Sequence, residues 1–271
     1  MCRTCFPQSN SIRIRDELIM KLFIKVRYLG TNYCGYQVQP NAPSIQQELN
    51  KAARILFGYD CDIVGCSRTD SGVHANEFCA TVSQKGSDDL ITTLSPERVP
   101  LAFSAHLPPD ISVFDAAWVA SDFHARYDVV EKEYIYRIYN SPVRSPFWEG
   151  RSYHLPRVLD DGALERMNRA AAYLVGKQDF AAYMAQGSNV ATTVRTVKAA
   201  SVERDGDMII FRISADGFLY NMVRILTGTL IDVGLGKIEP EDIPTITASC
   251  DRSRAGMTVP ACGLYLNRVL Y

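Results

Sequence analysis

The chain has 271 residues, of which 47% are hydrophobic and 22% charged, and its 29 basic residues nearly balance its 30 acidic ones. This composition is typical of an ordinary globular protein of one or two domains and excludes a largely disordered chain. It also excludes a membrane-spanning chain, because no apolar run approaches the ~20 residues that a spanning helix needs. The balanced charge argues against indiscriminate nucleic-acid binding, although a local cleft of Lys and Arg could still bind RNA.

The first 19 residues contain basic side chains but no apolar core, so they do not predict a secretory signal. We expect a disordered extension there. The eight cysteines do not predict a metal site either, because Cys2-x-x-Cys5 has no second pair and the other six stand singly. We therefore expect reduced thiols that pack as small apolar groups.

Apolar periodicity predicts four strands and a helix in the first half of the chain. The helix begins at Ser44, which forms a capping-box pattern with Gln47, and it ends at Gly58. The predicted strands are 21–28, one that begins at 63–64, one around 78–82, and 111–119. Residues 86–109 give no clear pattern.

The second half repeats the same kinds of element. Its predicted strands are 132–139, 193–203, 208–215 and 264–271, and its predicted helices are 164–174, closed by Gly176, and 218–233. The pair Asp205-Gly206 is a strong hairpin signal between two of these strands. Strands that alternate with helices and form hairpins indicate an α+β fold with antiparallel pairing.

The segment Arg68-Thr69-Asp70-Ser71-Gly72-Val73-His74 places a carboxylate two residues from a cation. By residue type alone, Asp-Ser-Gly is ordinary turn chemistry. The whole segment nevertheless resembles the active-site motif of the tRNA pseudouridine synthase A family, Gly-Arg-Thr-Asp-Ala-Gly-Val-His, in six of eight positions. The two departures, Ser67 and Ser71, replace one small residue by another.

Further segments resemble the same family in the same order, over roughly residues 21–271. The stretch from Tyr28 to Gln37 resembles a family segment, with Leu29 in place of Asp and Tyr36 in place of Trp. The other matching runs are Asp122–Arg126, Lys132–Tyr136, Gly176–Phe180 and Met222–Gly228. Several ordered matches are a specific signal where each alone is weak.

The resemblance implies a pseudouridine synthase fold, in which two ferredoxin-like halves form one large, mostly antiparallel sheet with helices packed on it and a central cleft. Residues 20–120 would form the half that carries the nucleophile, and 121–271 the other half. It further implies a cytoplasmic, homodimeric isomerase that converts uridine to pseudouridine at positions 38, 39 and 40 of the tRNA anticodon arm. No cofactor, metal, membrane or DNA is expected.

Arg224 is a candidate catalytic residue on physical grounds as well. The predicted helix 218–233 is apolar around most of its circumference, so Arg224 should be largely buried and need a counter-ion. The resemblance implies Asp70 as that counter-ion, and Asp232 is the structural alternative. A neighbouring arginine would lower the pKa of Asp70 and keep it ionised as the nucleophile.

The resemblance implies that Tyr134 is also catalytic, stacked on the target base and available to accept the C5 proton. Its periodicity allows core packing equally well. Arg68 would contact a phosphate or occupy the space left by the extruded nucleotide, with a solvated arginine as the alternative. His74 and Arg126 are the other predicted substrate contacts, with packing and a solvated strand edge as their alternatives. The remaining cations and acids that could line an RNA groove, or simply form a solvated edge, are Glu131, Lys132 and Arg137.

Two routes for the mechanism and two competing functions stay open. Asp70 could attack C6 of uracil or act at the ribose, and neither route needs redox chemistry. One competing function is an N-glycosidase that releases uracil, although no second carboxylate to activate water is evident. The other is a tRNA-binding and folding protein without catalysis.

Overall fold

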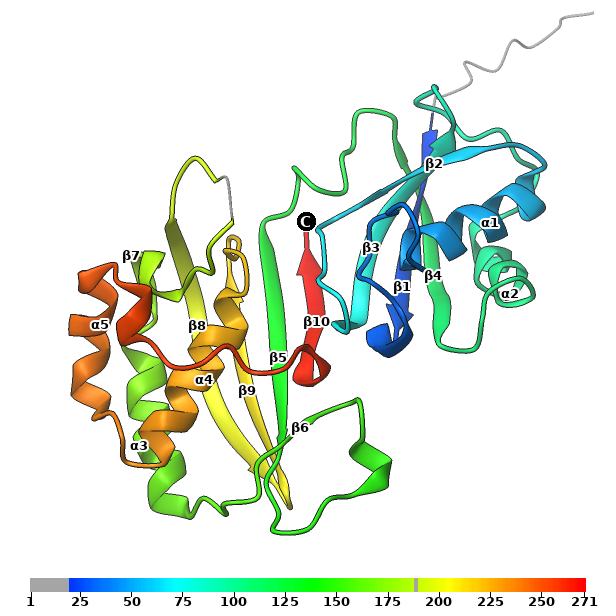
Figure 1. Cartoon of the computed structure of the whole chain (residues 1–271). Helices are drawn as coiled ribbons and strands as arrows, with labels where there is room; N and C mark the ends of the chain where they lie inside the picture. Colours follow the sequence, from blue (N-terminus) through cyan, green and yellow to red (C-terminus); the bar gives the residue numbers. More distant parts are fainter. Residues whose placement is uncertain (1–19, 188–189) are drawn as a thin grey trace, which may run out of the picture.

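The computed structural model describes residues 20–187 and 190–271, so the predicted extension 1–19 lies outside the described residues. Ten strands form one sheet in the order β4-β1-β3-β10-β5-β9-β8-β7, with β2 also beside β3 and β6 also beside β5 (Figure 1). The strands are β1 (Met20–Tyr28), β2 (Cys61–Gly65), β3 (His74–Gln84), β4 (Ile111–Ala120), β5 (Glu131–Tyr139), β6 (Tyr153–His154), β7 (Gly176–Asp179), β8 (Val194–Asp205), β9 (Met208–Ala215) and β10 (Leu264–Leu270).

The two halves of the sheet share one topology. In the first, β1, β2, β3 and β4 lie antiparallel in the order β4-β1-β3-β2, with α1 (Ile45–Phe57) after β1 and α2 (Val99–Ser104) before β4. In the second, β5, β8, β9 and β10 lie in the order β10-β5-β9-β8, and β7 extends the edge. This βαββαβ arrangement is ferredoxin-like. The predicted α+β fold class is therefore confirmed, whereas the proposed domain limits 20–120 and 121–271 stay predictions.

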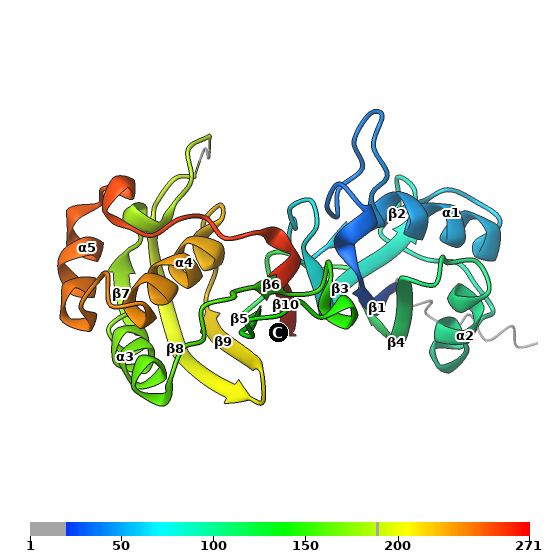
Figure 2. The same ribbon diagram turned by 60° about the horizontal axis from the view of Figure 1, so that its bottom comes forward.

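A short parallel pairing joins the halves. Tyr265 and Leu266 of β10 pair with His74 and Ala75 at the start of β3, whereas the other pairings along the main path of the sheet are antiparallel. Figure 2 shows β10 between two groups of helices, α1 and α2 at one end and α3 (Asp161–Ala172), α4 (Met222–Gly234) and α5 (Ile243–Ser249) at the other. The junction thus lies in the middle of the sheet, directly beside the predicted nucleophile segment.

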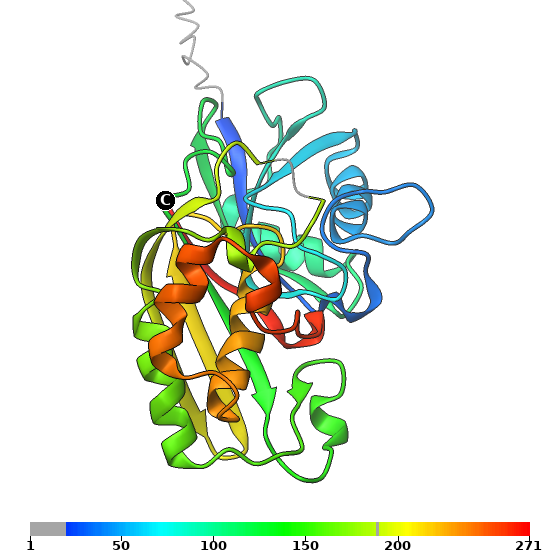
Figure 3. The ribbon, with the colours of Figure 1, turned by 60° about the vertical axis from the view of Figure 1, so that its left-hand side comes forward.

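Local sequence explains where the helices begin and end. The Ser44 hydroxyl accepts a hydrogen bond from the amide of Gln47 at the start of α1, and Gly58 ends the helix in the left-handed conformation with φ 81°. The helix α4 is buried over most of its surface, and Figure 3 shows it with α3 and α5 over one face of β8 and β9. None of the helices in the described part of the chain is long and apolar enough to cross a membrane.

Several elements differ from the predictions. The helix predicted from residue 218 begins at Met222, because Asn221 adopts the left-handed conformation with φ 59° and residues 218–220 form a loop. The helix predicted to run to residue 174 ends at Ala172. The segment 86–109, which had no clear pattern, contains α2. The unpredicted β6, β7 and α5 are all short, so their periodic signal is weak.

Candidate active site

A cleft of about 680 Å³ lies between the halves of the sheet. Its walls come mainly from three segments: the connection from β2 to β3, the beginning of β5 with the loop before it, and the loop before α4 with the start of that helix. Gly187, Val190 and Leu264 complete the lining. The residues that line it include Ser67, Arg68, Thr69, Asp70, Val73, Arg126, Lys132, Tyr134, Phe218, Leu219, Asn221 and Leu264. Four of the predicted site residues, Asp70, Tyr134, Arg68 and Arg126, therefore meet in one cleft.

The turn that carries Asp70 is held against the segment 28–36. The hydroxyls of Tyr28 and Thr69 share a buried hydrogen bond of 2.9 Å, and the amide of Tyr36 donates to the carbonyl of Thr69 at 3.2 Å. A Cβ at Gly35, whose φ is 85°, would lie 2.3 Å from that same carbonyl oxygen. A side chain at Gly35 would therefore displace the turn, so glycine at this position fixes Asp70 at the cleft wall.

The direction of the pKa shift predicted for Asp70 needs a correction. We expected a neighbouring arginine to lower its pKa, but the pKa of the carboxyl is raised above its ordinary value of 3.8. Burial is the larger cause and raises the pKa, because it disfavours the charged form; the charge of Arg224 acts in the opposite sense and is the smaller cause. The cleft thus holds a partly desolvated carboxylate that Arg224 only partly stabilises.

Arg224 acts on Asp70 from behind the cleft wall. Its Nη1 donates to Oδ1 of Asn221 at 2.7 Å, and its Nε donates to the carbonyl of Val259 at 2.7 Å. Within the described residues no ion pair of 4.0 Å or less joins it to Asp70. The alternative prediction, that Asp232 is the counter-ion of Arg224, is wrong. The carboxylate of Asp232 forms an ion pair with Lys237 at 2.8 Å, and no ion pair among the described residues joins it to Arg224.

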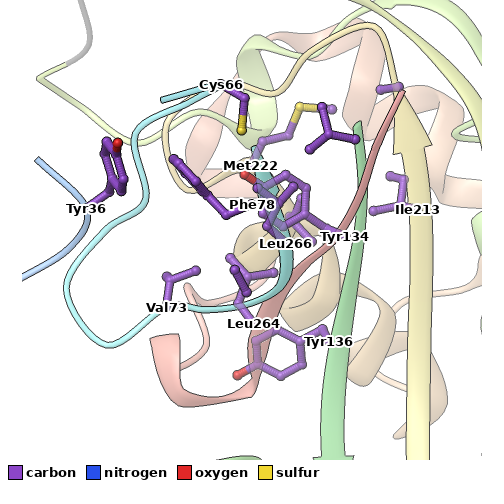
Figure 4. Close-up of a cluster of buried hydrophobic side chains, with 14 of the residues drawn as sticks. Tyr36, Cys66, Val73, Phe78, Tyr134, Tyr136, Ile213, Met222, Leu264 and Leu266 are labelled. Atoms are coloured by element: carbon purple, nitrogen blue, oxygen red, sulfur yellow. The ribbon is translucent and has the colours of Figure 1, made fainter. Parts of the chain in front are cut away.

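Tyr134 belongs to both the core and the cleft. It is 8% exposed, its ring meets that of Phe218 edge to face at 5.1 Å, and Figure 4 shows it among Phe78, Met222 and Leu266 (Figure 4). The two interpretations of its periodicity are thus compatible. Burial is the largest cause of a pKa well above the ordinary tyrosine value, so its hydroxyl stays protonated at neutral pH.

His74 lies beneath the turn and does not line the cleft. It is 0% exposed, and both ring nitrogens are engaged: Nδ1 accepts from the amide of Gly30 at 2.9 Å, and Nε2 donates to the carbonyl of Cys262 at 3.0 Å. Burial lowers its pKa. The packing alternative therefore describes its surroundings better than the predicted substrate contact. By contrast, Arg68 and Arg126 are exposed at the cleft.

Two residues that matter to the site had not been assigned to it, and a third, Lys132, had been considered as a cation of an RNA groove or of a solvated strand edge. Asn221 and Val259 hold Arg224, and Lys132 lines the cleft beside Tyr134. The sequence indicates a special role for Asn221 only weakly, since asparagine is one of the residues that tolerate the left-handed conformation. It gives no indication for Val259, which contributes only its backbone carbonyl. No group of three or more His, Cys, Asp or Glu residues that could hold a metal ion lies within residues 20–187 and 190–271.

Comparison with known proteins finds relatives that cover most of the chain. Residues 170–271 match the family model for tRNA pseudouridine synthases. The chain is 43% identical over 247 residues to tRNA pseudouridine synthase A of Acetivibrio thermocellus, covering 91% of this chain and 97% of that protein. It is 45% identical over 252 residues to the protein of the same name from Moorella thermoacetica, covering 92% and 99%. A crystal structure of a Cbf5-Nop10-Gar1 complex aligns with a TM-score of 0.38 and 14% identity, over 90% of this chain and 48% of that one.

Relatives of this identity and coverage, together with a cleft between two ferredoxin-like halves, define an isomerase that modifies tRNA. The chain belongs to the tRNA pseudouridine synthase A family. The predicted family and the predicted enzyme class are therefore confirmed.

Proposed function

We propose that the protein converts uridine to pseudouridine in the anticodon arm of tRNA, at positions 38, 39 and 40, with Asp70 as the nucleophile. The observation that supports this proposal best is that Asp70 is the one carboxylate among the described residues lining the cleft. It stands there beside the aromatic ring of Tyr134 and within the field of Arg224. The family membership supports the substrate class, because the relatives are tRNA-modifying enzymes by name.

The chemistry follows from these groups. Asp70 attacks in its ionised form, the bond between N1 of the base and C1′ of the ribose breaks, and the uracil turns and rejoins C1′ through C5. The bond formed to the carboxylate breaks again, which returns Asp70 to its ionised form. The proton on C5 then leaves and one is gained at N1, so the atoms balance without redox change. Attack at C6 and action at the ribose are both compatible with this balance. Arg224 contributes by opposing the rise in the pKa of Asp70.

Tyr134 and Arg68 have separate roles in this proposal. Tyr134 stacks on the flipped uracil, and base-aromatic contacts contribute about 1–3 kcal/mol per base. Because its hydroxyl stays protonated at neutral pH, Tyr134 does not act as a phenolate base. If Tyr134 accepts the C5 proton, the phenolic proton of Tyr134 must leave at the same time. Arg68 and Arg126, exposed at the cleft, contact the RNA backbone or the space vacated by the base.

The site argues against the N-glycosidase alternative. Hydrolysis of the base-sugar bond by the retaining route needs a second carboxyl group to activate water. Among the described residues that line the cleft, none besides Asp70 carries a carboxylate. We therefore expect rearrangement and no release of free uracil.

The test is incubation with unmodified tRNA transcripts, followed by carbodiimide-based mapping of pseudouridine and chromatography for free uracil. We expect product at positions 38–40 and no uracil. Asp70→Ala is the matched control and should form no product; equal modification by this variant would overturn the nucleophile assignment, and product elsewhere in the tRNA would overturn the site preference. Sedimentation of the free protein tests the homodimer that we propose on the basis of the family.

A further inference from the structure

The lysines of the described chain differ in how their charge is compensated. Of the three that are half-buried, two have a carboxylate within 4.0 Å: Lys21 lies 2.9 Å from Asp88, and Lys25 lies 3.3 Å from Glu77. The third is Lys132, and no carboxylate of the described residues lies within that distance of its ammonium group. The remaining lysines are exposed.

Lys132 is set in the floor of the cleft. It lies on β5 between β9 and β10, paired in register with Ala215 and Val269, so its backbone is fixed on both sides. It is two residues from Tyr134 on the same face of the strand, and both side chains line the cleft. The separation along the strand is about 7 Å.

The surroundings of Lys132 disfavour its charge. Its pKa is lowered, chiefly by burial; the nearby Cys66 thiol acts in the opposite sense, and the guanidinium of Arg126 lowers the pKa further. A desolvated charge costs several kcal/mol, roughly, unless it is paired. Among the described residues that line the cleft, the other charges are those of Arg68, Arg126 and the carboxylate of Asp70. In the free protein, therefore, the cleft has more positive than negative charge, and Lys132 has no anion of its own.

An anion that enters with the substrate would complete this site. The carbonyl oxygens of uracil are neutral and cannot compensate an ammonium charge, whereas each nucleotide of RNA carries a phosphate. Lysine is a compact point charge on a flexible stem, which suits a phosphate oxygen. A nucleotide whose base stacks on Tyr134 brings a backbone phosphate within reach of that stem.

We infer that Lys132 binds a backbone phosphate next to the flipped uridine. The substrate then supplies the counter-ion that the described residues of the free protein do not provide. This inference rests on the proposed function, since it takes RNA as the substrate. It makes Lys132 a substrate-binding residue whose charge is compensated only in the complex. RNA binding should accordingly become less salt-dependent when the charge is removed.

The first test measures the affinity of an anticodon-arm RNA hairpin by fluorescence anisotropy over a range of salt concentrations. Lys132→Gln should weaken binding and reduce the slope of log Kd against log salt by about 0.7–0.9, the value for one phosphate contact. Lys132→Arg should keep most of the slope. Lys25→Gln, which removes a half-buried lysine that already has Glu77 as its partner, is the matched control and should leave the slope unchanged.

The second test uses hairpins in which one phosphate at a time is a neutral methylphosphonate. The wild-type protein should lose affinity at a linkage next to the target uridine, and Lys132→Gln should be insensitive at that same linkage. Equal sensitivity of both proteins at every linkage would overturn the inference. An unchanged salt slope of Lys132→Gln together with a reduced turnover would also overturn it, because it would indicate that Lys132 contacts the base and not a phosphate.

Thermal unfolding separates these outcomes from misfolding. Because the ammonium of Lys132 is unpaired in the free protein, Lys132→Gln should unfold at the same temperature as the wild type or higher. A lower midpoint with an unchanged salt slope would make the lysine structural and overturn the inference. If the wild type forms no pseudouridine in the hairpin at all, the proposed function fails instead, and the two failures are thereby distinguished.

Discussion

Asn221 should control the activity through the position of Arg224. Its Oδ1 accepts a hydrogen bond of 2.7 Å from the guanidinium, and its side chain makes no capping bond to α4. A hydrogen bond to a charged group contributes about 1.5–3 kcal/mol. If Asn221→Gly loses this contribution in the transition state, kcat should fall by about 10- to 100-fold. The KM for RNA should change little, because the effect reaches the substrate through Asp70.

Two variants separate the hydrogen bond from the backbone. Asn221 has φ 59°, a conformation that glycine adopts freely but that costs alanine roughly 1–2 kcal/mol. Asn221→Gly and Asn221→Ala should therefore lose similar amounts of activity, whereas only Asn221→Ala should lose the additional stability. Asn41, with φ 66° and an exposed side chain, provides Asn41→Gly as the control for the effect of glycine on thermal stability.

The assay is pseudouridine formation under single-turnover conditions across a range of pH. A less firmly held Arg224 opposes the rise in the pKa of Asp70 less effectively, so the acid limb of the rate profile should move to higher pH in Asn221→Gly. Wild-type kcat together with an unmoved acid limb in this variant would refute the reasoning, because it would show that Arg224 needs no support from Asn221.

Three further predictions follow from the same geometry. Asp70→Asn should raise the free energy of unfolding at about pH 7.5: the pKa of Asp70 is raised in the folded state, so its contribution to stability is full below the unfolded value of 3.8 and is lost as the pH rises through the folded pKa. The gain should vanish in urea titrations well below pH 3.8, and an equal gain at both pH values would contradict this account. Tyr134→Ala should lose affinity for the hairpin by about 1–3 kcal/mol in anisotropy titrations while Tyr134→Phe keeps it, since the ring provides the stacking; equal losses would assign the affinity to the hydroxyl. Gly228→Ala should destabilise the protein by about 1–3 kcal/mol and lower kcat, because its Cβ would lie 1.9 Å from the carbonyl oxygen of Met257 and would displace the segment that carries Val259; calorimetry with unchanged stability would contradict the packing.

Much of the fold follows from local sequence. The strand β1 and the helix α1 are predicted within a residue or so, because alternation, an N-cap and a left-handed glycine are all local signals. The start of α4 is not predicted this closely, because residues 218–220 are apolar enough to continue the helical pattern and the left-handed Asn221 interrupts it. The unpredicted strand β7 has only four residues, and its pairing with β8 is what defines it.

The candidate site shows a similar division. The motif around Asp70 predicts a nucleophile, but its charge state depends on the balance between burial and the field of Arg224, and burial exerts the larger effect. The support for Arg224 comes from Val259, which is 35 residues away in the chain and contributes a carbonyl that every residue possesses. A backbone partner of this kind cannot be predicted from the residue types in the sequence.

His74 shows most clearly why the motif and the fold have to be considered together. Its Nδ1 accepts a hydrogen bond from Gly30 in the first half of the sheet, and its Nε2 donates one to Cys262 in the second, at the single place where β3 and β10 run parallel. This pattern requires the neutral ring with its proton on Nε2, and the lowered pKa maintains that state near neutral pH. The histidine that ends the motif therefore joins the two halves directly behind Asp70, so the proposed nucleophile and the junction beside its cleft are specified by the same seven residues.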